Sequence, residues 1–174
     1  MIEPSRQPDA APDFAWPVRV YYEDTDAGGV VYYANYLKFF ERARTEWLRA
    51  CGIDQSRIAD ETGAIFIVRH AALDYRAPAR LDDALQIVCR IARIGRASVE
   101  FEQQAWRGNT LLVAADIRIG CVDRSAFKPT AIPPPRLRRT RARTGRKRHG
   151  KPCQRRLREC RLDKADELDP MIRH

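Results

Sequence analysis

The polar and apolar positions of this chain first alternate and then change to a helical period. In residues 16–23 every second residue is apolar or aromatic, as in a strand with one face in water. In residues 34–51 apolar positions recur at steps of three and four, which predicts an amphipathic helix of about five turns. Its apolar stripe comprises Tyr36, Phe40, Ala43, Trp47 and Ala50. Gly52 follows, where a helix end prefers glycine.

Four more strand-like runs follow a polar segment at residues 55–63. They span residues 65–75, 85–94, 97–106 and 110–123. Short glycine-containing loops separate the last three, which predicts an antiparallel meander. One strand, one long helix and four strands together predict an α+β fold in which a five-stranded antiparallel sheet covers the helix. Candidate core or interface residues are Val88, Ile91, Val99, Phe101, Leu112, Ile117 and Ile119.

The length of 174 residues suits one domain, which we place at residues 15–132. Residues 1–14 are rich in Pro, Ala and Asp and are expected to form a flexible arm. Residues 133–174 are expected to form a disordered, Pro- and Arg-rich basic tail, because they offer little apolar surface to bury.

Most of the positive charge lies in that tail. The net charge is +9, but residues 136–174 hold 15 Lys and Arg against 5 Asp and Glu, and the rest of the chain holds 17 against 18. The predicted domain therefore shows no compositional sign of nucleic-acid binding. Nonspecific binding of nucleic acid or an acidic partner through the tail is a separate hypothesis, without interleaved aromatic residues that would stack on bases.

The five cysteines form no CxxC pair, and their odd number suits reduced thiols in a cytosol. No metal or redox role is expected for them. The chain shows no signal-peptide core and no apolar stretch of membrane-spanning length, so we expect a cytoplasmic protein without a transmembrane segment.

Candidate chemistry lies between the first strand and the helix. Gly28 and Gly29 let a bound group approach the backbone closely, and a helix entered just after Val31 offers unpaired N–H groups to an oxygen that gains negative charge. Asp26 would then act as nucleophile or general base. The alternative is that Asp26 and Asp24 only organise a turn or cap the helix, and we assign that loop-organising role to Asp24.

Other common catalytic arrangements lack support. His70 is the only histidine before the tail, and it lies in a predicted strand, where a lone histidine is usually structural. The chain contains no GxSxG, Walker A or HExxH motif.

Residues 24–37, DTDAGGVVYYANYL, resemble hotdog-fold acyl-CoA thioesterases of the 4-hydroxybenzoyl-CoA thioesterase family, most closely the Tol-Pal-associated, YbgC-like branch. Further matches are at residues 39–46, 75–83, 95–98 and 121–123, so that the resemblance covers about residues 16–132. It implies a hotdog fold, in which a five-stranded antiparallel sheet wraps around one long central helix.

The resemblance also implies an activity: hydrolysis of short-chain or aromatic acyl-CoA to the free acid and coenzyme A. Asp26 matches the family's catalytic carboxylate, and Tyr33 matches the residue whose backbone N–H polarises the thioester carbonyl. Gly28, Gly29 and Val30 would contact the substrate. No metal or other cofactor is implied, because coenzyme A is part of the substrate. The resemblance implies a homodimer or homotetramer, and acyl carrier protein is an alternative acyl carrier.

Several alternatives stay open at this point. Arg76, Arg80 and Arg96 are candidate contacts for the phosphates of coenzyme A, or else parts of a solvated face. Many YbgC-like members carry histidine where this chain has Tyr33, which affects the expected acyl preference. The tail resembles a lineage-specific extension or a shifted reading frame. A domain that binds acyl-CoA or acyl carrier protein without turnover is the non-catalytic alternative.

Overall fold

The computed structural model describes residues 13–133, which hold two α-helices and five strands. The arm and the tail expected from the sequence lie outside these residues, except at their inner ends. The elements are β1 (Phe14–Arg19), a short 3-10 helix (Tyr22–Asp24), α1 (Asn35–Ala50), α2 (Gln55–Thr62), β2 (Ala64–Tyr75), β3 (Ala84–Ile94), β4 (Ser98–Arg107) and β5 (Thr110–Asp123).

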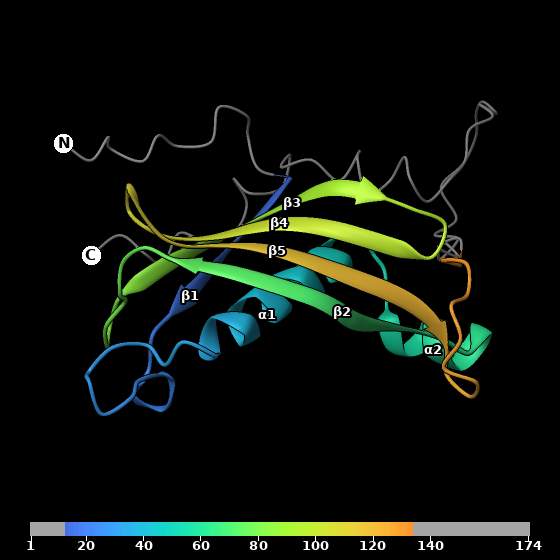
Figure 1. Cartoon of the computed structure of the whole chain (residues 1–174), viewed down its shortest axis with the longest axis horizontal. Coiled ribbons are helices and arrows are strands. Elements are labelled where there is room, and N and C mark those ends of the chain that lie inside the picture. Colours follow the sequence, from blue (N-terminus) through green and yellow to red (C-terminus); the bar gives the residue numbers. More distant parts are fainter. Residues whose placement is uncertain (1–12, 134–174) are drawn as a thin grey trace, which may run out of the picture.

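The five strands form one antiparallel sheet in the order β1-β3-β4-β5-β2, curved around α1 (Figure 1). The predicted α+β hotdog arrangement is therefore confirmed, including the β3-β4-β5 meander. The chain enters on β1, crosses the concave side as α1, and returns on β2 at the opposite edge of the sheet. The loop between β1 and α1 consequently lies at one end of the sheet, and α2 lies at the other (Figure 1).

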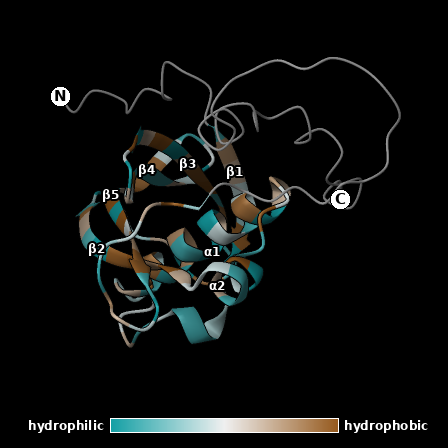
Figure 2. Cartoon of the chain, turned by 90° about the vertical axis from the view of Figure 1, so that its right-hand side faces the viewer, coloured by the Kyte–Doolittle hydropathy of each residue, from teal (hydrophilic) through white to brown (hydrophobic). Residues whose placement is uncertain are grey.

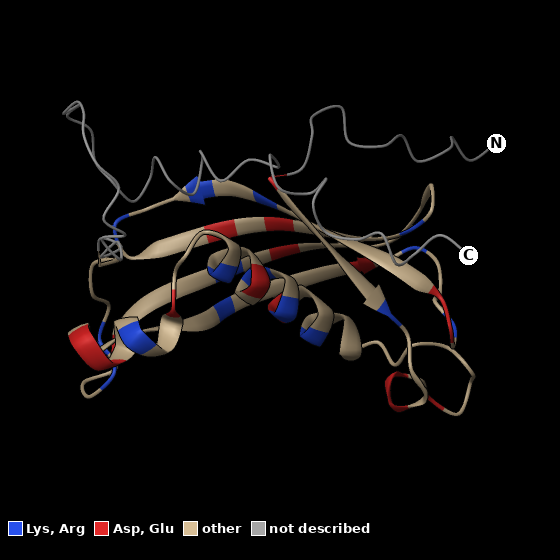
Figure 3. Ribbon diagram, turned by 180° about the vertical axis from the view of Figure 1, so that it is seen from behind, with Lys and Arg blue, Asp and Glu red and all other residues tan. Residues whose placement is uncertain are grey.

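The helix packs on the sheet through the stripe predicted from its period. Its buried residues are Asn35, Tyr36, Phe39, Phe40, Ala43 and Trp47. Ala50 is exposed at the last turn, so its place in the stripe was wrong, because the helix has by then passed beyond the sheet's apolar surface. Figure 2 shows hydrophobic residues along the strands of the sheet, and Figure 3 shows charged residues recurring along α1.

The inward face of the sheet completes the core. The predicted Val99, Phe101, Leu112, Ile117 and Ile119 are buried, and Ile91 packs against them partly buried. Val88 is only half-buried, because Leu85, Ile87 and Cys89 occupy the inward positions of β3 and Val88 alternates to the other side.

The first strand is shorter at its carboxyl end than its alternation suggests. β1 pairs with β3 only as far as Arg19 opposite Ala84, where β3 begins. The chain then turns, and the backbone N–H of Tyr21 donates to Asp24 Oδ2 at 2.9 Å. A predicted strand through residue 23 was therefore wrong over its last four residues, since the partner strand does not extend that far. At the other end, β1 begins at Phe14, the last residue of the expected arm.

The polar segment at residues 55–63 contains a helix that the periodicity did not indicate. Asp54 caps α2 by accepting a 3.1 Å hydrogen bond from the N–H of Arg57, and Gly63 ends it in the left-handed conformation with φ 69°. Arg57 and Glu61 form an ion pair one turn apart. None of the residues of α2 is fully buried. The segment therefore lacks the apolar stripe from which a helix can be predicted. Neither helix of the described region is long and apolar enough to cross a membrane.

Candidate active site

The loop between β1 and α1 closes on itself around Asp26. Thr25 and Val31 form an isolated antiparallel bridge, and the N–H of Asp26 donates to the carbonyl of Val30 at 2.9 Å. The N–H of Gly29 donates back to the carbonyl of Asp26 at 3.0 Å, and Gly29 has φ 72°, a conformation that favours glycine. The loop is thus a tight turn that holds Asp26 at its rim.

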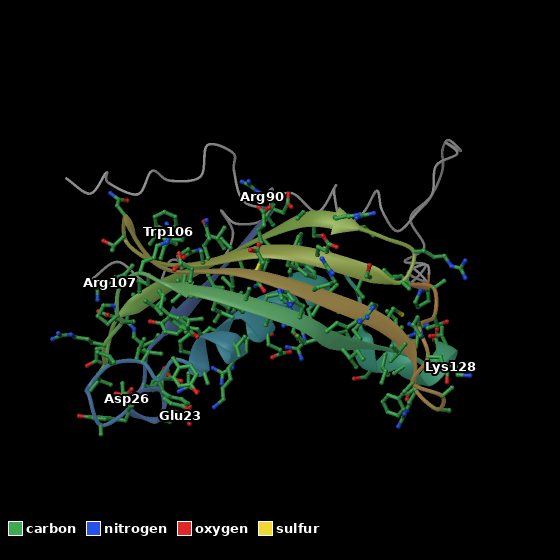
Figure 4. The ribbon with its side chains drawn as sticks, in the orientation of Figure 1. Glu23, Asp26, Arg90, Trp106, Arg107 and Lys128 are labelled. Atoms are coloured by element: carbon green, nitrogen blue, oxygen red, sulfur yellow. The ribbon has the colours of Figure 1, made fainter. Side chains whose placement is uncertain are left out.

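The Asp26 side chain is exposed, and one of its oxygens is held in place. Oδ1 accepts a 2.8 Å hydrogen bond from the N–H of Gly28. Oδ2 has no hydrogen-bond partner among the described residues. The turn-forming role that the sequence allowed as the alternative is therefore present, but it occupies one oxygen and leaves the other facing solvent. Figure 4 shows Asp26 on this loop, beside the start of α1.

Asp24 has the organising role predicted for it. The residue is buried, its Oδ2 accepts from Tyr21, and its carbonyl accepts a 2.8 Å bond from the N–H of Tyr32 and a 2.9 Å bond from Asn35 Nδ2. Asn35 is the first residue of α1 and links that helix to the loop. The sequence reasoning did not single out Asn35, although an asparagine at the start of an apolar-faced helix was a usable signal.

Tyr33 lies just before α1, which begins at Asn35 and not immediately after Val31. Its backbone N–H has no hydrogen-bond partner among residues 13–133, and its carbonyl accepts a 3.0 Å bond from the hydroxyl of Tyr75. The rings of Tyr33 and Tyr75 meet edge to face with centroids 6.4 Å apart. An unpaired N–H at a fixed position beside a helix start is a suitable donor to an oxyanion.

The Asp26 carboxylate is near enough to Tyr32, the residue before Tyr33, for its charge to act on the Tyr32 phenol. The neighbouring Tyr33 phenol, whose ring centroid lies 4.6 Å away, is the largest cause that raises the pKa of the Tyr32 phenol, and the negative charge of Asp26 adds a smaller effect in the same direction. The Asp26 carboxylate and the residues before α1 therefore lie near one another in this loop.

A second loop, residues 76–83 between β2 and β3, supports the first one. The N–H of Val31 donates to the carbonyl of Ala79 at 2.9 Å, and the N–H of Ala79 donates to the hydroxyl of Tyr36 at 3.2 Å. Asp83 Oδ2 accepts from the N–H of Arg80 at 2.8 Å and from Arg107 Nη1 at 2.6 Å. These contacts tie the Asp26 loop to α1 and to the end of β4.

The predicted arginines occupy two separate places in the chain. Arg76 and Arg80 lie on or beside this supporting loop, and both are exposed. Arg76 Nε is paired with Asp74 at 2.8 Å, whereas the Arg80 guanidinium has no ion-pair partner among the described residues. Arg96 is in the turn between β3 and β4, at the opposite end of the sheet from Asp26, and it is also exposed. One chain therefore brings Arg76 and Arg80 toward Asp26, but not Arg96.

No group of three His, Cys, Asp or Glu side chains gathers within the described region in a way that would hold a metal ion. His70 is exposed on β2, next to a register shift between Val68 and His70.

Comparison with known proteins adds to this geometry. The family model described as the thioesterase superfamily matches residues 28–114, half of the chain. The acyl-CoA thioesterase YbgC of Haemophilus influenzae is 47% identical over 120 residues, which are 69% of this chain and 88% of that protein. The acyl-CoA thioester hydrolase YbgC of Escherichia coli strain CFT073 is 50% identical over 121 residues, covering 69% of this chain and 90% of the relative.

A solved structure agrees with the sequence matches. The crystal structure of a probable thioesterase from Bartonella henselae superposes with a TM-score of 0.64 at 38% identity, covering 68% of this chain and 98% of that one. The chain therefore belongs to the thioesterase superfamily, with the hotdog fold, and within it to the family of the YbgC acyl-CoA thioesterases. The match to the family model begins two residues after Asp26, so that the role of this residue depends on the geometry above.

Proposed function

We propose that this protein hydrolyses acyl-CoA thioesters of short-chain or aromatic acids, with Asp26 as the catalytic carboxylate. The observation that carries the proposal is the pairing of an exposed carboxylate, half engaged by Gly28, with the unpaired N–H of Tyr33 beside a helix start. The YbgC relatives named above support the thioester substrate.

Two routes suit this geometry. As general base, Asp26 takes a proton from water, and the resulting hydroxide adds to the thioester carbonyl. As nucleophile, Asp26 attacks the carbonyl itself and forms an anhydride that water then hydrolyses. On either route the carbonyl oxygen becomes an anion that accepts from the Tyr33 N–H, and the carbon–sulfur bond breaks when this intermediate collapses. Coenzyme A leaves as a thiolate, which takes its proton from the Asp26 carboxyl on the general-base route and from solvent on the nucleophilic route. Neither route needs a metal or another cofactor.

The surrounding residues have proposed binding roles. The thioester would contact the backbone of Gly28, Gly29 and Val30. It can approach this part of the Asp26 loop closely because the two glycines carry no side chain. Arg80 is the better candidate for a phosphate of coenzyme A, because its guanidinium has no ion pair within the described region and Arg76 is engaged by Asp74. Acyl carrier protein stays the alternative acyl carrier, and free cysteines in the described region suit the cytoplasm, where we place the protein.

A homodimer or homotetramer is part of the proposal. β2 forms one edge of the sheet, and Val68 on this strand is 54% exposed. This edge of β2 pairs with no other strand of the described region and is available for pairing with the same strand of a second copy. Arg96 would then reach an Asp26 site only from that second copy. Sedimentation analysis of the wild type and a Val68→Lys variant tests the assembly, because a charge on the edge should shift the mass toward the monomer.

The catalytic proposal is tested by thiol release from a panel of acyl-CoA substrates. Asp26→Asn should lower kcat by about a hundredfold or more without a change in thermal stability, because the side chain is exposed and an amide cannot act as base. Glu23→Gln is the matched control, since Glu23 is an exposed carboxylate on the same loop (Figure 4). Turnover unchanged in Asp26→Asn would contradict the assignment. Binding of acyl-CoA without turnover by the wild type would support the non-catalytic alternative.

A further inference from the structure

Two arginines lie on either side of the entrance to β3. Arg19 ends β1 and Arg107 ends β4, and these two strands are the neighbours of β3 in the sheet. Arg19 Nη1 donates to the carbonyl of Asp82 at 2.6 Å. Arg107 Nη1 donates to Asp83 Oδ2 at 2.6 Å and to the carbonyl of Pro78 at 3.3 Å. Both arginines therefore hold the supporting loop, which leads into β3.

The contacts of Arg107 join two points of the supporting loop. Pro78 and Asp83 stand at the two ends of a short segment, and one nitrogen atom of Arg107 bonds to both. Asp83 Oδ2 also accepts from the N–H of Arg80 at 2.8 Å, so the segment folds back on this carboxylate. Arg107 thereby closes the segment into a ring of hydrogen bonds, and Ala79 lies within it.

Ala79 is the residue through which the supporting loop contacts the Asp26 loop. It is fully buried, its carbonyl accepts from the N–H of Val31 at 2.9 Å, and its N–H donates to the hydroxyl of Tyr36 at 3.2 Å. Val31 in turn forms the bridge with Thr25, the residue before Asp26. The position of Ala79 therefore helps to set where the Asp26 loop lies relative to α1.

We propose that Arg107 is a positioning residue for the hydrolysis: it fixes Ala79, and through Val31 it holds Asp26 in place beside the start of α1. The inference rests on the proposed function, because Arg107 itself touches no reacting atom. The guanidinium suits this role since it stays charged and offers several N–H donors to a carboxylate and a carbonyl together. Figure 4 shows Arg107 at the end of the molecule that carries Asp26. The alternative is that the partly exposed guanidinium binds a phosphate of coenzyme A.

Kinetics with two thioesters of one acid separate positioning from phosphate binding. Benzoyl-CoA carries the phosphates of coenzyme A, and the N-acetylcysteamine thioester of benzoic acid carries none. Arg107→Met should lower kcat/KM at least about fivefold for both thioesters, and for benzoyl-CoA the loss should be in kcat and not in KM. Arg107→Lys should recover part of the activity, because one ammonium group can contact a carboxylate and a carbonyl as Nη1 does.

Arg118→Met is the matched control for these kinetics. Arg118 of β5 pairs with Glu100 of β4 at 3.2 Å, so this variant also removes an arginine–carboxylate pair from the sheet. Glu100 lies near the start of β4, whereas Arg107 is its last residue. The control should therefore keep the wild-type kcat and KM for both thioesters.

Amide hydrogen exchange tests the same link without turnover. In Arg107→Met the N–H of Val31 should exchange at least about fivefold faster than in the wild type, because its acceptor on Ala79 is no longer held in place. The N–H of Ile132 donates to the carbonyl of Arg96 at the other end of the sheet, at 2.9 Å, and should exchange at the wild-type rate. Thermal melts establish which variants fold, and Arg107→Lys supplies the comparison if Arg107→Met does not.

The outcomes are distinguishable. A loss confined to benzoyl-CoA and expressed in KM would assign Arg107 to phosphate binding and overturn the proposal. Faster exchange at Val31 with unchanged kcat/KM would also overturn it, since the loop could then move without a cost to the reaction. If the wild type hydrolyses neither thioester, the proposed function fails. The exchange rates then decide alone whether Arg107 holds the Asp26 loop: a faster rate in the variant supports this link, and equal rates refute it.

Discussion

The hydroxyl of Tyr75, the last residue of β2, donates a 3.0 Å hydrogen bond to the backbone carbonyl of Tyr33, just before α1. Edge strand β2 therefore holds the carbonyl of Tyr33 in place. The backbone N–H of the same residue is the proposed oxyanion donor. We expect Tyr75 to be a positioning residue and not a catalytic one, because its contact is to the carbonyl of Tyr33.

Tyr75→Phe should lower kcat about fivefold and change KM little, because the loss of one hydrogen bond of about 1 kcal/mol loosens a donor that acts in the transition state. The ring contacts of Tyr75 survive in phenylalanine, so thermal stability should fall only slightly. Tyr22→Phe is the matched control, since Tyr22 is 81% exposed and its hydroxyl has no partner among the described residues. Steady-state kinetics of both variants measure the effect. A kcat of Tyr75→Phe equal to that of Tyr22→Phe would contradict the positioning role of Tyr75.

The two glycines of the Asp26 loop should respond differently to alanine. A Cβ on Gly28 would lie 3.1 Å from Asp26 Oδ1, so Gly28→Ala should displace the carboxylate and lower kcat with little loss of stability. A Cβ on Gly29 would meet nothing within 4 Å, but φ 72° is strained for alanine, so Gly29→Ala should cost about 1 kcal/mol of stability. Kinetics and urea unfolding of both variants measure the two effects. An equal loss of stability in Gly28→Ala and Gly29→Ala would contradict the predicted difference between the two positions.

The pH dependence of stability should include a contribution from Asp83. Burial of this carboxyl raises its pKa, but the Arg80 N–H and the Arg107 guanidinium outweigh burial, and the pKa of Asp83 lies below its ordinary value. A carboxyl with a lowered folded-state pKa stabilises the fold above its unfolded pKa, near 3.8, and this contribution is lost as the pH falls through the lower folded value.

Asp83→Asn should therefore destabilise the protein by about 1 kcal/mol at neutral pH, a modest figure because the pair is partly exposed. The difference from the wild type should shrink below about pH 4 as the wild-type carboxyl becomes protonated. Urea unfolding of both proteins at several pH values between neutral and acid measures it. A difference that stays constant down to the most acid pH would assign the effect to packing and not to charge.

Cys89 should be chemically inert in the folded protein. Burial raises the pKa of its thiol to about 12, against a weaker opposing effect of the hydrogen bond from Gln103. Because the thiolate is the reactive species, iodoacetamide at pH 8 should leave Cys89 unmodified in the native state and alkylate it in urea. Peptide mapping by mass spectrometry reports each cysteine separately. Alkylation of Cys89 in the native protein, at the rate seen in urea, would show that β3 opens.

The sequence predicts four of the five strands within a residue or two because their alternation is regular and their turns contain glycine. It misses the 3-10 helix at Tyr22–Asp24 because the alternation continues after the pairing partner has ended. It also misses α2, whose only signals are its caps, Asp54 and Gly63.

At the site, the sequence predicts Asp26 from a carboxylate and two glycines before a helix, and only the family resemblance adds Tyr33. It does not indicate the supporting contacts from Ala79 and Tyr75, because these residues are distant in the chain and come together only through the order of the strands. The contact between Arg44 and Gln103 is not indicated by the sequence for the same reason, because the two residues are distant in the chain. The signal for it was Gln103, a polar residue at an inward position among Val99, Phe101 and Ala105.

Gln103 of β4 joins α1 to the sheet from within the core. Its side-chain amide donates to the carbonyl of Phe40 at 3.1 Å and to Cys89 Sγ at 2.9 Å while it accepts from Arg44. A rotation of α1 about its own axis would break the contacts to Phe40 and Arg44 together and leave the buried Gln103 amide without these partners. The orientation of α1, and with it the position of Tyr33 just before its first turn, is therefore constrained partly from within the core, by one amide side chain of β4.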